Sequence, residues 1–472
     1  MNKFSLLTLP ALLAMPLAPL HAAEPSKSEK LNVLFLFADD QRADTIAALG
    51  NPVIKTPNLD RLVRSGLSFN RAYMQGSFGG ATCIPSRAML MTGRSLFHLD
   101  DGKLSREQTW PAAFGQAGYA TQVSGKWHNG NKMLVTSFQN GRSLYCKGMS
   151  HDPLNDSVRN LVNGQMSDEY PAGKHLCASF ADAAVQFLRQ GGSAQNKNKP
   201  FFYYVSFDAP HDPHVIPKGF PLHYDPAKVP LPNFLPQHPF DNGDMKVRDE
   251  RLLAYPRTPQ AAREFLAEYY RYISYLDSLI GQVLDALEAS PYAKNTIVVF
   301  SADSGVARGS HGLIGKQNLY EYDSVRVPLI ISGPGIPAGK RTDAMLYLYD
   351  VLPTLGGMCG VPPPPKSDGI NFSAVLRDPS RFGRSEMVFA YKDVQRAIAT
   401  PDWKLIRYPQ VNQTQLFDLQ ADPYEIHNLV ADPKQAARVA ELSALMKQKL
   451  AAAGDSPTGR RSGKSDDKDG IP

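Results

Sequence analysis

The stretch NVLFLFA at residues 32–38, which is followed by Asp39 and Asp40, decides the fold. A short, unbroken apolar run is typical of a strand buried on both faces, as in a parallel sheet. Two similar runs occur later, FFYYVSF at residues 201–207 and TIVVFSA at residues 296–302. Apolar residues spaced by three and four predict an amphipathic helix over residues 265–287. Strands that alternate with helices predict an α/β fold with a mainly parallel, mixed sheet flanked by helices.

Two folded parts are expected. Residues 24–380 are predicted to form the large α/β domain, and a polar, proline- and glycine-containing stretch at residues 377–385 indicates a linker. Residues 381–455 are predicted to form a small α+β domain, an antiparallel sheet packed by one helix. That helix is expected to have Asp432 as N-cap, Pro433 at its first position and Gly454 at its end. Its strands are predicted at residues 387–391, 395–400, 404–408 and 415–419, and residues 456–472 as a disordered tail.

Composition sets broad limits on function. The chain has 472 residues, 43% of them hydrophobic and 10% aromatic, so it can bury a large core and is not a disordered protein. No repeat of 20–50 residues indicates a solenoid or propeller. The net charge of +6 suits an acidic partner, but no block of basic residues indicates nucleic-acid binding.

The N-terminus predicts export. Lys3 precedes an apolar run, broken by three prolines, that ends in the small residues Ala22 and Ala23. This pattern is typical of a signal peptide over residues 1–23, and the protein is expected to be periplasmic or secreted. A membrane anchor is the alternative, although a spanning helix needs about 20 apolar residues. The four cysteines do not form a disulfide framework; Cys146 and Cys177 could form one bridge or stay as thiols.

Acidic and basic side chains follow the predicted strands. Asp39 and Asp40 end the first run, His211 lies just beyond the second, and Asp303 ends the third. In open α/β sheets, ligands bind beyond the carboxyl ends of the strands, so these residues are expected on one rim. A single aspartate after a strand is often a helix N-cap. Carboxylates at separate strand ends instead favour a hard cation such as Ca²⁺ or Mg²⁺.

The segment CIPSR at residues 83–87, followed by TGR at residues 92–94, is the most specific part of the sequence. Pro85 suits the first turn of a helix, which places Cys83 at the helix N-terminus, where anions are favoured. Arg87 lies one turn further and could reach the same anion. A buried structural cysteine and a thiolate nucleophile are the alternatives.

This pattern resembles the signature of the formylglycine-dependent (type I) sulfatases of the alkaline phosphatase superfamily. Other segments resemble that family in the same order: DDQR, TPNLD, GKWH, APH, HGLIGK and QLFDL, which begin at residues 39, 56, 125, 209, 311 and 415. The resemblance covers residues 32–429. It implies that a separate maturation enzyme oxidises Cys83 to formylglycine, whose hydrated aldehyde attacks sulfur.

The resemblance also implies site roles. A cationic cradle for the sulfate, together with the nucleophile, would consist of Cys83, Arg87, Lys126, His128, His211 and Lys316. The metal, Ca²⁺ with Mg²⁺ as the alternative, would be held by Asp39, Asp40, Cys83, Asp303 and Ser304. Ser304 departs from the family, which often has asparagine or histidine there. The hydroxyl could ligate weakly, or a water or another group could replace it.

The substrate is predicted less directly. Residues 212–258 form a loop-rich insert before the long helix, with several histidines and arginines. Such an insert could be a substrate wall or a solvated loop. We expect a sulfated carbohydrate or polysaccharide, with His214, Arg248 and Arg251 as substrate-binding residues. Alternatives are an aryl sulfatase, a phosphate or phosphonate ester hydrolase of the same superfamily, and a non-enzymatic sulfated-glycan binding protein. The oligomeric state cannot be predicted.

Overall fold

The computed structural model describes residue 1 and residues 30–100, 102–105, 108–190 and 199–455. The predicted signal peptide and C-terminal tail therefore lie outside the described residues, apart from Met1. Within the described residues, no helix is both long and apolar enough to cross a membrane. All four cysteines lie in the described part of the chain and are free thiols, so Cys146 and Cys177 are not bridged.

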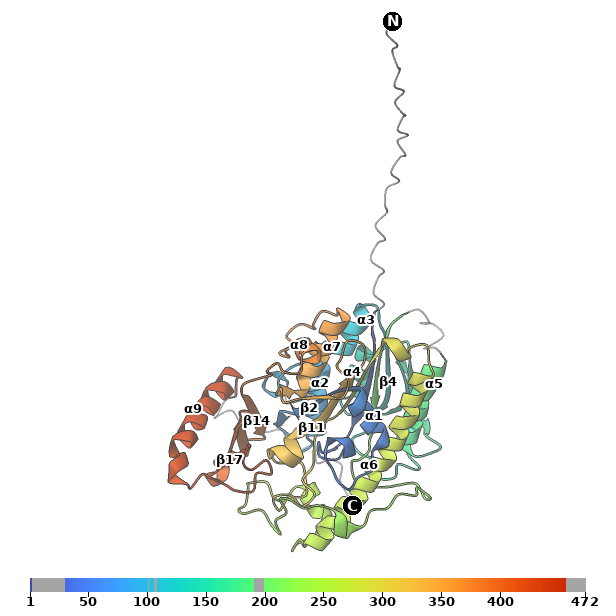
Figure 1. Ribbon diagram of the computed structural model, residues 1–472. Helices are drawn as coiled ribbons and strands as arrows, with labels where there is room; N and C mark the ends of the chain where they lie inside the picture. The colour runs from blue at the N-terminus through green and yellow to red at the C-terminus, as the bar shows by residue number, and fades with distance from the viewer. Residues whose placement is uncertain (2–29, 101, 106–107, 191–198, 456–472) are drawn as a thin grey trace. The chain divides into compact units, whose positions relative to one another are not determined.

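The larger sheet is mixed, and its centre is parallel (Figure 1). Four adjacent strands, in the order β10, β1, β9 and β4, run in the same direction, and β5 continues them. On one side, β11 pairs antiparallel with β10, and β2 pairs antiparallel with β11. On the other side, β6 pairs antiparallel with β5, and β7 pairs antiparallel with β6. The strands are β1 Asn32–Ala38, β2 Gly66–Tyr73, β4 Ala120–Lys126, β5 Asn140–Tyr145, β6 Ser157–Val162, β7 Gln165–Met166, β8 Tyr170–Pro171, β9 Phe201–Ser206, β10 Thr296–Ala302, β11 Arg326–Ser332, β12 Lys340–Thr342 and β13 Leu346–Tyr347.

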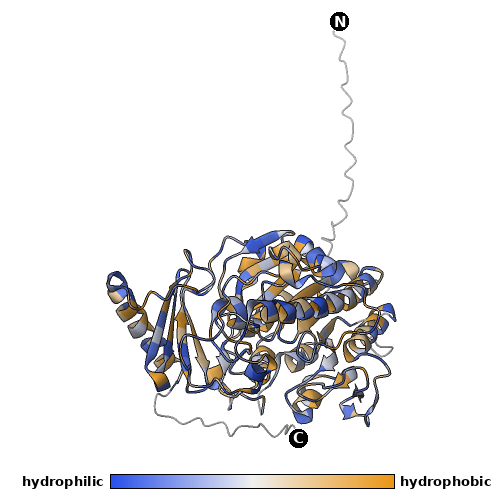
Figure 2. Ribbon diagram, turned by 90° about the horizontal axis from the view of Figure 1, so that it is seen from below, coloured by the Kyte–Doolittle hydropathy of each residue, from blue (hydrophilic) through white to orange (hydrophobic). Residues whose placement is uncertain are grey.

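Helices cover both faces of this sheet. Successive residues of β1 point to opposite faces and are buried on both. Val33, Phe35 and Phe37 join one buried cluster, and Leu34 and Leu36 join another. The first cluster includes residues of α2 Cys83–Thr92, α3 Trp110–Gln116, α4 Asn131–Ser137, α7 Val351–Cys359 and α8 Ser373–Arg377. The second includes residues of α1 Pro57–Ser65, α5 Leu176–Arg189 and α6 Pro259–Glu288. The predicted α/β class and the flanking helices are confirmed, and Figure 2 shows the hydropathy of these elements.

The smaller sheet contains five strands in the order β17, β16, β15, β14 and β3. Its antiparallel part is β14 Met387–Tyr391, β15 Gln395–Ala399, β16 Trp403–Tyr408 and β17 Gln413–Asp418. These agree with the predicted strands to within two residues. The helix α9 Ala436–Ala452 follows a short 3₁₀ turn, Pro433–Gln435, whose N-cap is Asp432. The fifth strand, β3 Gly76–Ser77, comes from the region before α2 and pairs in parallel with Ala390 and Tyr391.

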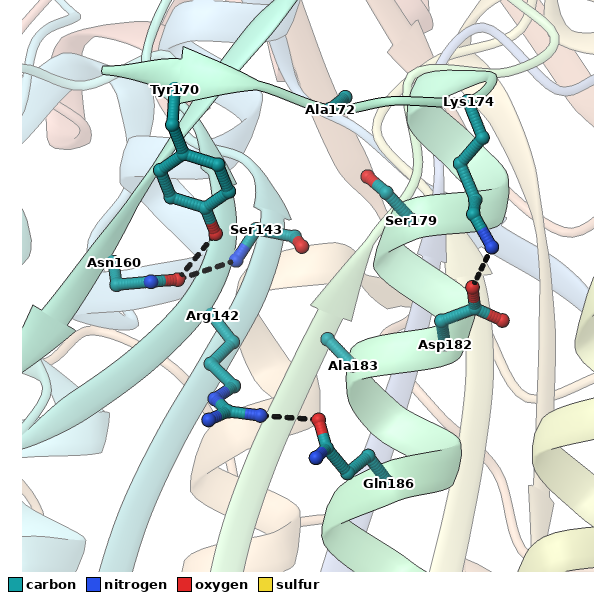
Figure 3. Close-up of a pocket in the computed structure, with 10 residues that line it drawn as sticks. All are labelled: Arg142, Ser143, Asn160, Tyr170, Ala172, Lys174, Ser179, Asp182, Ala183 and Gln186. Atoms are coloured by element: carbon teal, nitrogen blue, oxygen red, sulfur yellow. Dashed lines mark hydrogen bonds and ion pairs between the residues drawn. The ribbon is translucent and has the colours of Figure 1, made fainter.

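A pocket of about 540 Å³ lies between the β5–β6 region and α5 (Figure 3). Its polar groups are largely paired with one another. Lys174 Nζ lies 2.5 Å from Asp182 Oδ2, Arg142 donates to Gln186, and Tyr170 donates to Asn160 over 2.8 Å. None of the residues that line this pocket belongs to the predicted site. The predicted catalytic, metal-binding and substrate-binding residues therefore lie outside this pocket.

Candidate active site

The four central parallel strands bring the predicted site residues to one rim. Asp39 and Asp40 follow β1, Asp303 follows β10, Lys126 ends β4, and His211 lies in the segment after β9. Main-chain hydrogen bonds hold these ends together: the Asp39 amide donates to the Ala209 carbonyl, and the Asp303 amide donates to the Ala38 carbonyl. Because parallel strands end at the same edge, sequence reasoning could place these residues together.

Buried cations bind the carboxylates at this rim. Arg87 Nε donates to Asp303 Oδ2 over 2.9 Å, and Arg87 Nη2 donates to Asp39 Oδ2 over 3.0 Å. Lys126 Nζ lies 2.5 Å from Asp39 Oδ2 and 2.9 Å from Asp208 Oδ1. Arg87, which was expected to reach an anion beside Cys83, is thus committed to two aspartates. Asp208 was missed by the sequence analysis, although it ends the FFYYVSF run three residues before His211.

Lys316 forms the third pairing of the rim. Its Nζ lies 2.7 Å from both carboxylate oxygens of Asp40. Burial opposes its charged form, but Asp40 more than offsets this and raises the pKa of Lys316 well above its usual value. Burial likewise favours protonation of Asp39, but Lys126 and Arg87 hold the pKa of that carboxyl far below its usual range. Asp39 is therefore ionised and Lys316 protonated at neutral pH.

Cys83 and His128 face each other at the edge of this network. Cys83 is the first residue of α2, in agreement with its predicted place at a helix N-terminus. It is 3% exposed. Burial raises the pKa of the Cys83 thiol to about 12. Burial, together with Lys126, lowers the pKa of His128 to about 2. A protonated thiol thus faces a neutral imidazole, with Cys83 Sγ 3.2 Å from His128 Nδ1. A hydroxyl at the position of Sγ could pass its proton to that nitrogen.

His211 is oriented by the residue that follows it. Its Nδ1 lies 2.7 Å from the main-chain oxygen of Asp212, so this nitrogen carries the proton and donates. Its Nε2 faces Asp40 Oδ2 at 3.5 Å. The imidazole therefore presents Nε2 to the rim.

The residues present fit a divalent cation. Ligand atoms of Asp39, Asp40 and His211 all lie within 4.8 Å of one another. Asp39 Oδ1 is buried and has no hydrogen-bond partner within the described residues, so it is an acceptor without a donor. Asp303 and Cys83, which were also predicted as ligands, are not part of this group of histidine, cysteine and carboxylate side chains. Instead Asp303 Oδ1 accepts from the Asp40 amide over 3.0 Å. His211 was predicted for the sulfate and not for the metal.

Ser304 contacts a carboxylate at the rim. Its Oγ donates to Asp40 Oδ1 over 2.9 Å. We predict that Ser304→Ala lowers metal affinity by about tenfold or less, because one hydrogen bond is lost and the carboxylates remain. Ser304→Asn should bind metal at least as tightly, because an amide oxygen is a better ligand than a hydroxyl. Calcium titration calorimetry on both variants checks this, and a complete loss of metal from Ser304→Ala would show that the hydroxyl is an essential ligand.

The three predicted substrate-binding residues lie in different surroundings. His214 packs among Phe265, Tyr269 and Tyr272 at tilted ring angles, with its ring centroid 5.7–5.9 Å from theirs. Arg248 is ion-paired with Asp212 and Asp249. Arg251 is exposed and has no ion pair with any other described residue. Of the three, Arg251 is the most exposed, whereas Arg248 and His214 are partly buried. Asp212 and the aromatic residues of α6 are distant in sequence from the side chains that they contact and gave no signal there.

Comparison with known proteins agrees with this geometry. The family described as Sulfatase matches residues 31–361. The chain belongs to the sulfatase family. A second match, to the family described as N-sulphoglucosamine sulphohydrolase, C-terminal, covers residues 309–453 of the sulfatase. The recognised resemblance to sulfatases is confirmed, and the protein is a sulfuric-ester hydrolase.

Relatives and solved structures extend the comparison along the sulfatase chain. An N-acetylglucosamine-6-O-sulfatase of Bacteroides thetaiotaomicron is 27% identical and covers 93% of this chain and 90% of its own. A structure of a protein in complex with its substrate D-glucosamine-2-N,6-O-disulfate has a TM-score of 0.70 at 22% identity and covers 90% of this chain and 99% of its own. The phosphonate monoester hydrolase of Agrobacterium radiobacter has a TM-score of 0.71 at 22% identity, with 90% and 96% covered. Both structures show the likeness of fold.

Proposed function

We propose that this sulfatase removes sulfate from a sulfated carbohydrate, with a formylglycine formed from Cys83 and one divalent cation. The observation that carries the proposal is the placement of Cys83 at the start of α2, against His128 and beside Lys126 and Lys316. A related N-acetylglucosamine-6-O-sulfatase supports a sugar as the substrate. Ca²⁺ is the proposed metal, because oxygen ligands predominate at the rim and the protein is expected to be exported.

Formation of formylglycine oxidises the β-carbon of Cys83 and removes its sulfur, so it requires an oxidant and a separate maturation enzyme. The hydrated aldehyde then supplies a hydroxyl nucleophile for sulfur. His128, whose imidazole is neutral, accepts the proton of a hydroxyl at this position. The alcohol of the substrate leaves from sulfur on the opposite side and takes up a proton from solvent. The second hydroxyl of the hydrate then loses its proton and expels sulfate, which restores the aldehyde.

The chain's own cations bind the sulfate. Lys126 and Lys316 are ionised. Lys126 is ion-paired with Asp39, and Lys316 is ion-paired with Asp40. A cation bound to those carboxylates would neutralise them and leave both ammonium groups available to sulfuryl oxygens. His211 Nε2 faces the same space, while Arg87 positions Asp39 and Asp303 from the buried side. Negative charge that builds on the sulfuryl oxygens is thereby stabilised.

The location and the domain boundaries are also proposals. We expect cleavage of a signal peptide over residues 1–23, followed by a catalytic region at residues 24–380 and a C-terminal region at residues 381–455. The named rim residues all belong to the catalytic region. The C-terminal region contacts that region instead, for example where the Tyr320 hydroxyl donates to Gln415 Oε1 over 2.8 Å. N-terminal sequencing of the mature, exported protein tests the cleavage site.

One assay separates the candidate functions. We predict that the purified, formylglycine-containing protein has a kcat/KM for 4-nitrophenyl sulfate at least about a hundredfold above that for 4-nitrophenyl phosphate or a phenylphosphonate monoester. A panel of defined sulfated oligosaccharides, with products measured by mass spectrometry, identifies the sugar. A preference for the phosphonate ester would favour the activity of the phosphonate monoester hydrolase of similar fold.

A further inference from the structure

Arg248 lies in the last part of the insert that separates β9 from α6. It begins a 3₁₀ turn, Arg248–Leu252, and its side chain is 30% exposed. Its guanidinium binds Asp212 through two nitrogens, Nη1 to Oδ1 over 3.2 Å and Nη2 to Oδ2. Nη1 also donates to Asp249 Oδ1 over 2.6 Å, and Nη2 lies 2.9 Å from Met149 Sδ. Both terminal nitrogens of the guanidinium are thus committed to protein atoms.

Each partner of Arg248 adjoins a different residue of the rim. Asp212 follows His211, and its main-chain oxygen accepts a hydrogen bond from His211 Nδ1. Asp249 Oδ2 accepts from Gln317 Nε2 over 2.9 Å, and Gln317 follows Lys316.

The third contact of Arg248 reaches the segment that packs on His128. Met149 follows Gly148, where an added Cβ would lie 2.5 Å from His128 Nε2. One guanidinium therefore connects the segments that hold three rim side chains.

The donors of Arg248 are largely used within the protein. Both terminal nitrogens bind the carboxylates of Asp212 and Asp249, so few donors are left for an anionic group on a sugar. Asp212 also faces Arg308, whose Nη2 lies 3.9 Å from Asp212 Oδ1 and whose side chain is buried over Phe265 and Tyr269. These contacts distinguish Arg248 from Arg251, which is exposed.

We propose that Arg248 is a positioning residue that fixes His128, His211 and Lys316 relative to one another, and that it is not a sugar contact. The inference rests on the proposed function, because these three side chains matter through the sulfate that they surround. A bidentate fork resists rotation of the carboxylate more than a single hydrogen bond does. A displacement of about 1 Å in a positioned group can cost about a hundredfold in rate.

The test compares Arg248→Met, which keeps the aliphatic stem, with Arg248→Lys and with the control Lys246→Met. Lys246 is exposed, lies in the same segment and loses the same charge. We expect Arg248→Met to lower kcat for 4-nitrophenyl sulfate by about 10- to 100-fold, with a smaller change in KM. Arg248→Lys should recover only part of this loss, because an ammonium group cannot form the bidentate fork. Unchanged kinetics on this sugar-free substrate would overturn the proposal.

A double-mutant cycle tests whether Arg248 acts through Asp212. If it does, Arg248→Met combined with Asp212→Asn should be no slower than the slower single variant. Multiplicative losses would overturn the coupling.

Hydrogen exchange provides a readout that does not need turnover. Arg248→Met, but not Lys246→Met, should speed amide exchange in residues 146–150 and 311–317. Unchanged exchange there would overturn the proposal whatever the activity. Failure of the wild-type protein to hydrolyse any sulfate ester would instead contradict the proposed function.

Discussion

Replacement of Cys83 by alanine is expected to abolish sulfate-ester hydrolysis. The methyl group cannot become an aldehyde, so no hydroxyl nucleophile can form beside His128. Loss of a nucleophile in hydrolases lowers kcat on the scale of 10⁶-fold, and we expect a loss of about that size, with the Tm unchanged within a few degrees. In the active wild-type protein, the peptide that contains residue 83 should be lighter than the encoded peptide and should react with an aldehyde probe.

The matched control for this prediction is Cys359→Ala. It removes a thiol at the end of α7 that lies 3.9 Å from the Leu31 oxygen, at the opposite end of β1 from Asp39. It should keep wild-type turnover. Substantial hydrolysis by Cys83→Ala would show that another group attacks sulfur, and the proposed mechanism would be wrong. An unmodified Cys83 in fully active protein would have the same consequence.

Removal of the divalent cation is expected to have the second-largest effect. Asp39 and Asp40 would keep their negative charges, and Lys126 and Lys316 would stay paired with them instead of with the sulfate. A bound metal stabilises developing charge by several kcal/mol, so chelation should lower kcat/KM by roughly 10³-fold. Calcium should restore activity and should also raise the Tm, by an amount that grows with the logarithm of its free concentration above the Kd, because a ligand that prefers the folded protein stabilises it.

The variant Asp39→Asn tests the same site without a chelator. It removes one ligand charge at nearly constant shape, so metal content measured by elemental mass spectrometry should fall. The control Asp182→Asn removes a carboxylate of the solvent-exposed pair with Lys174 and should leave metal content unchanged. A full complement of metal in Asp39→Asn would place the cation elsewhere.

Three of the four central parallel strands could be predicted from the sequence, because β1, β9 and β10 are mainly apolar runs. The fourth, β4, has the sequence ATQVSGK and was missed. The predicted boundaries of 32–38 and 296–302 agree with those of β1 and β10. The outer strands were not predicted, because short strands such as β7 and β8 carry no periodic pattern. The pairing of β3 with β14 was missed for the same reason, since two residues give no signal of a distant partner.

The site was predicted to the level of its segments but not of its contacts. Strand ends identified Asp39, Asp40 and Asp303, because their position follows from the topology of the sheet. The expectation that Arg248 and His214 contact a sugar remains a prediction. In the structure Arg248 is bound by Asp212, 36 positions away, and His214 packs among aromatic residues of α6. Partners this distant cannot be inferred from local pattern.

The short strand β3 has a consequence for the order of events during synthesis. It lies directly before the segment of Cys83, and its partner Ala390 leaves the ribosome only after most of the chain has been made. Gly76 allows this pairing, because an added Cβ would lie 1.8 Å from the Ala390 oxygen. In the folded protein β3 is paired with β14, and Cys83 is 3% exposed. An enzyme that oxidises Cys83 therefore has its opportunity while the last hundred or so residues are still being made or remain unfolded.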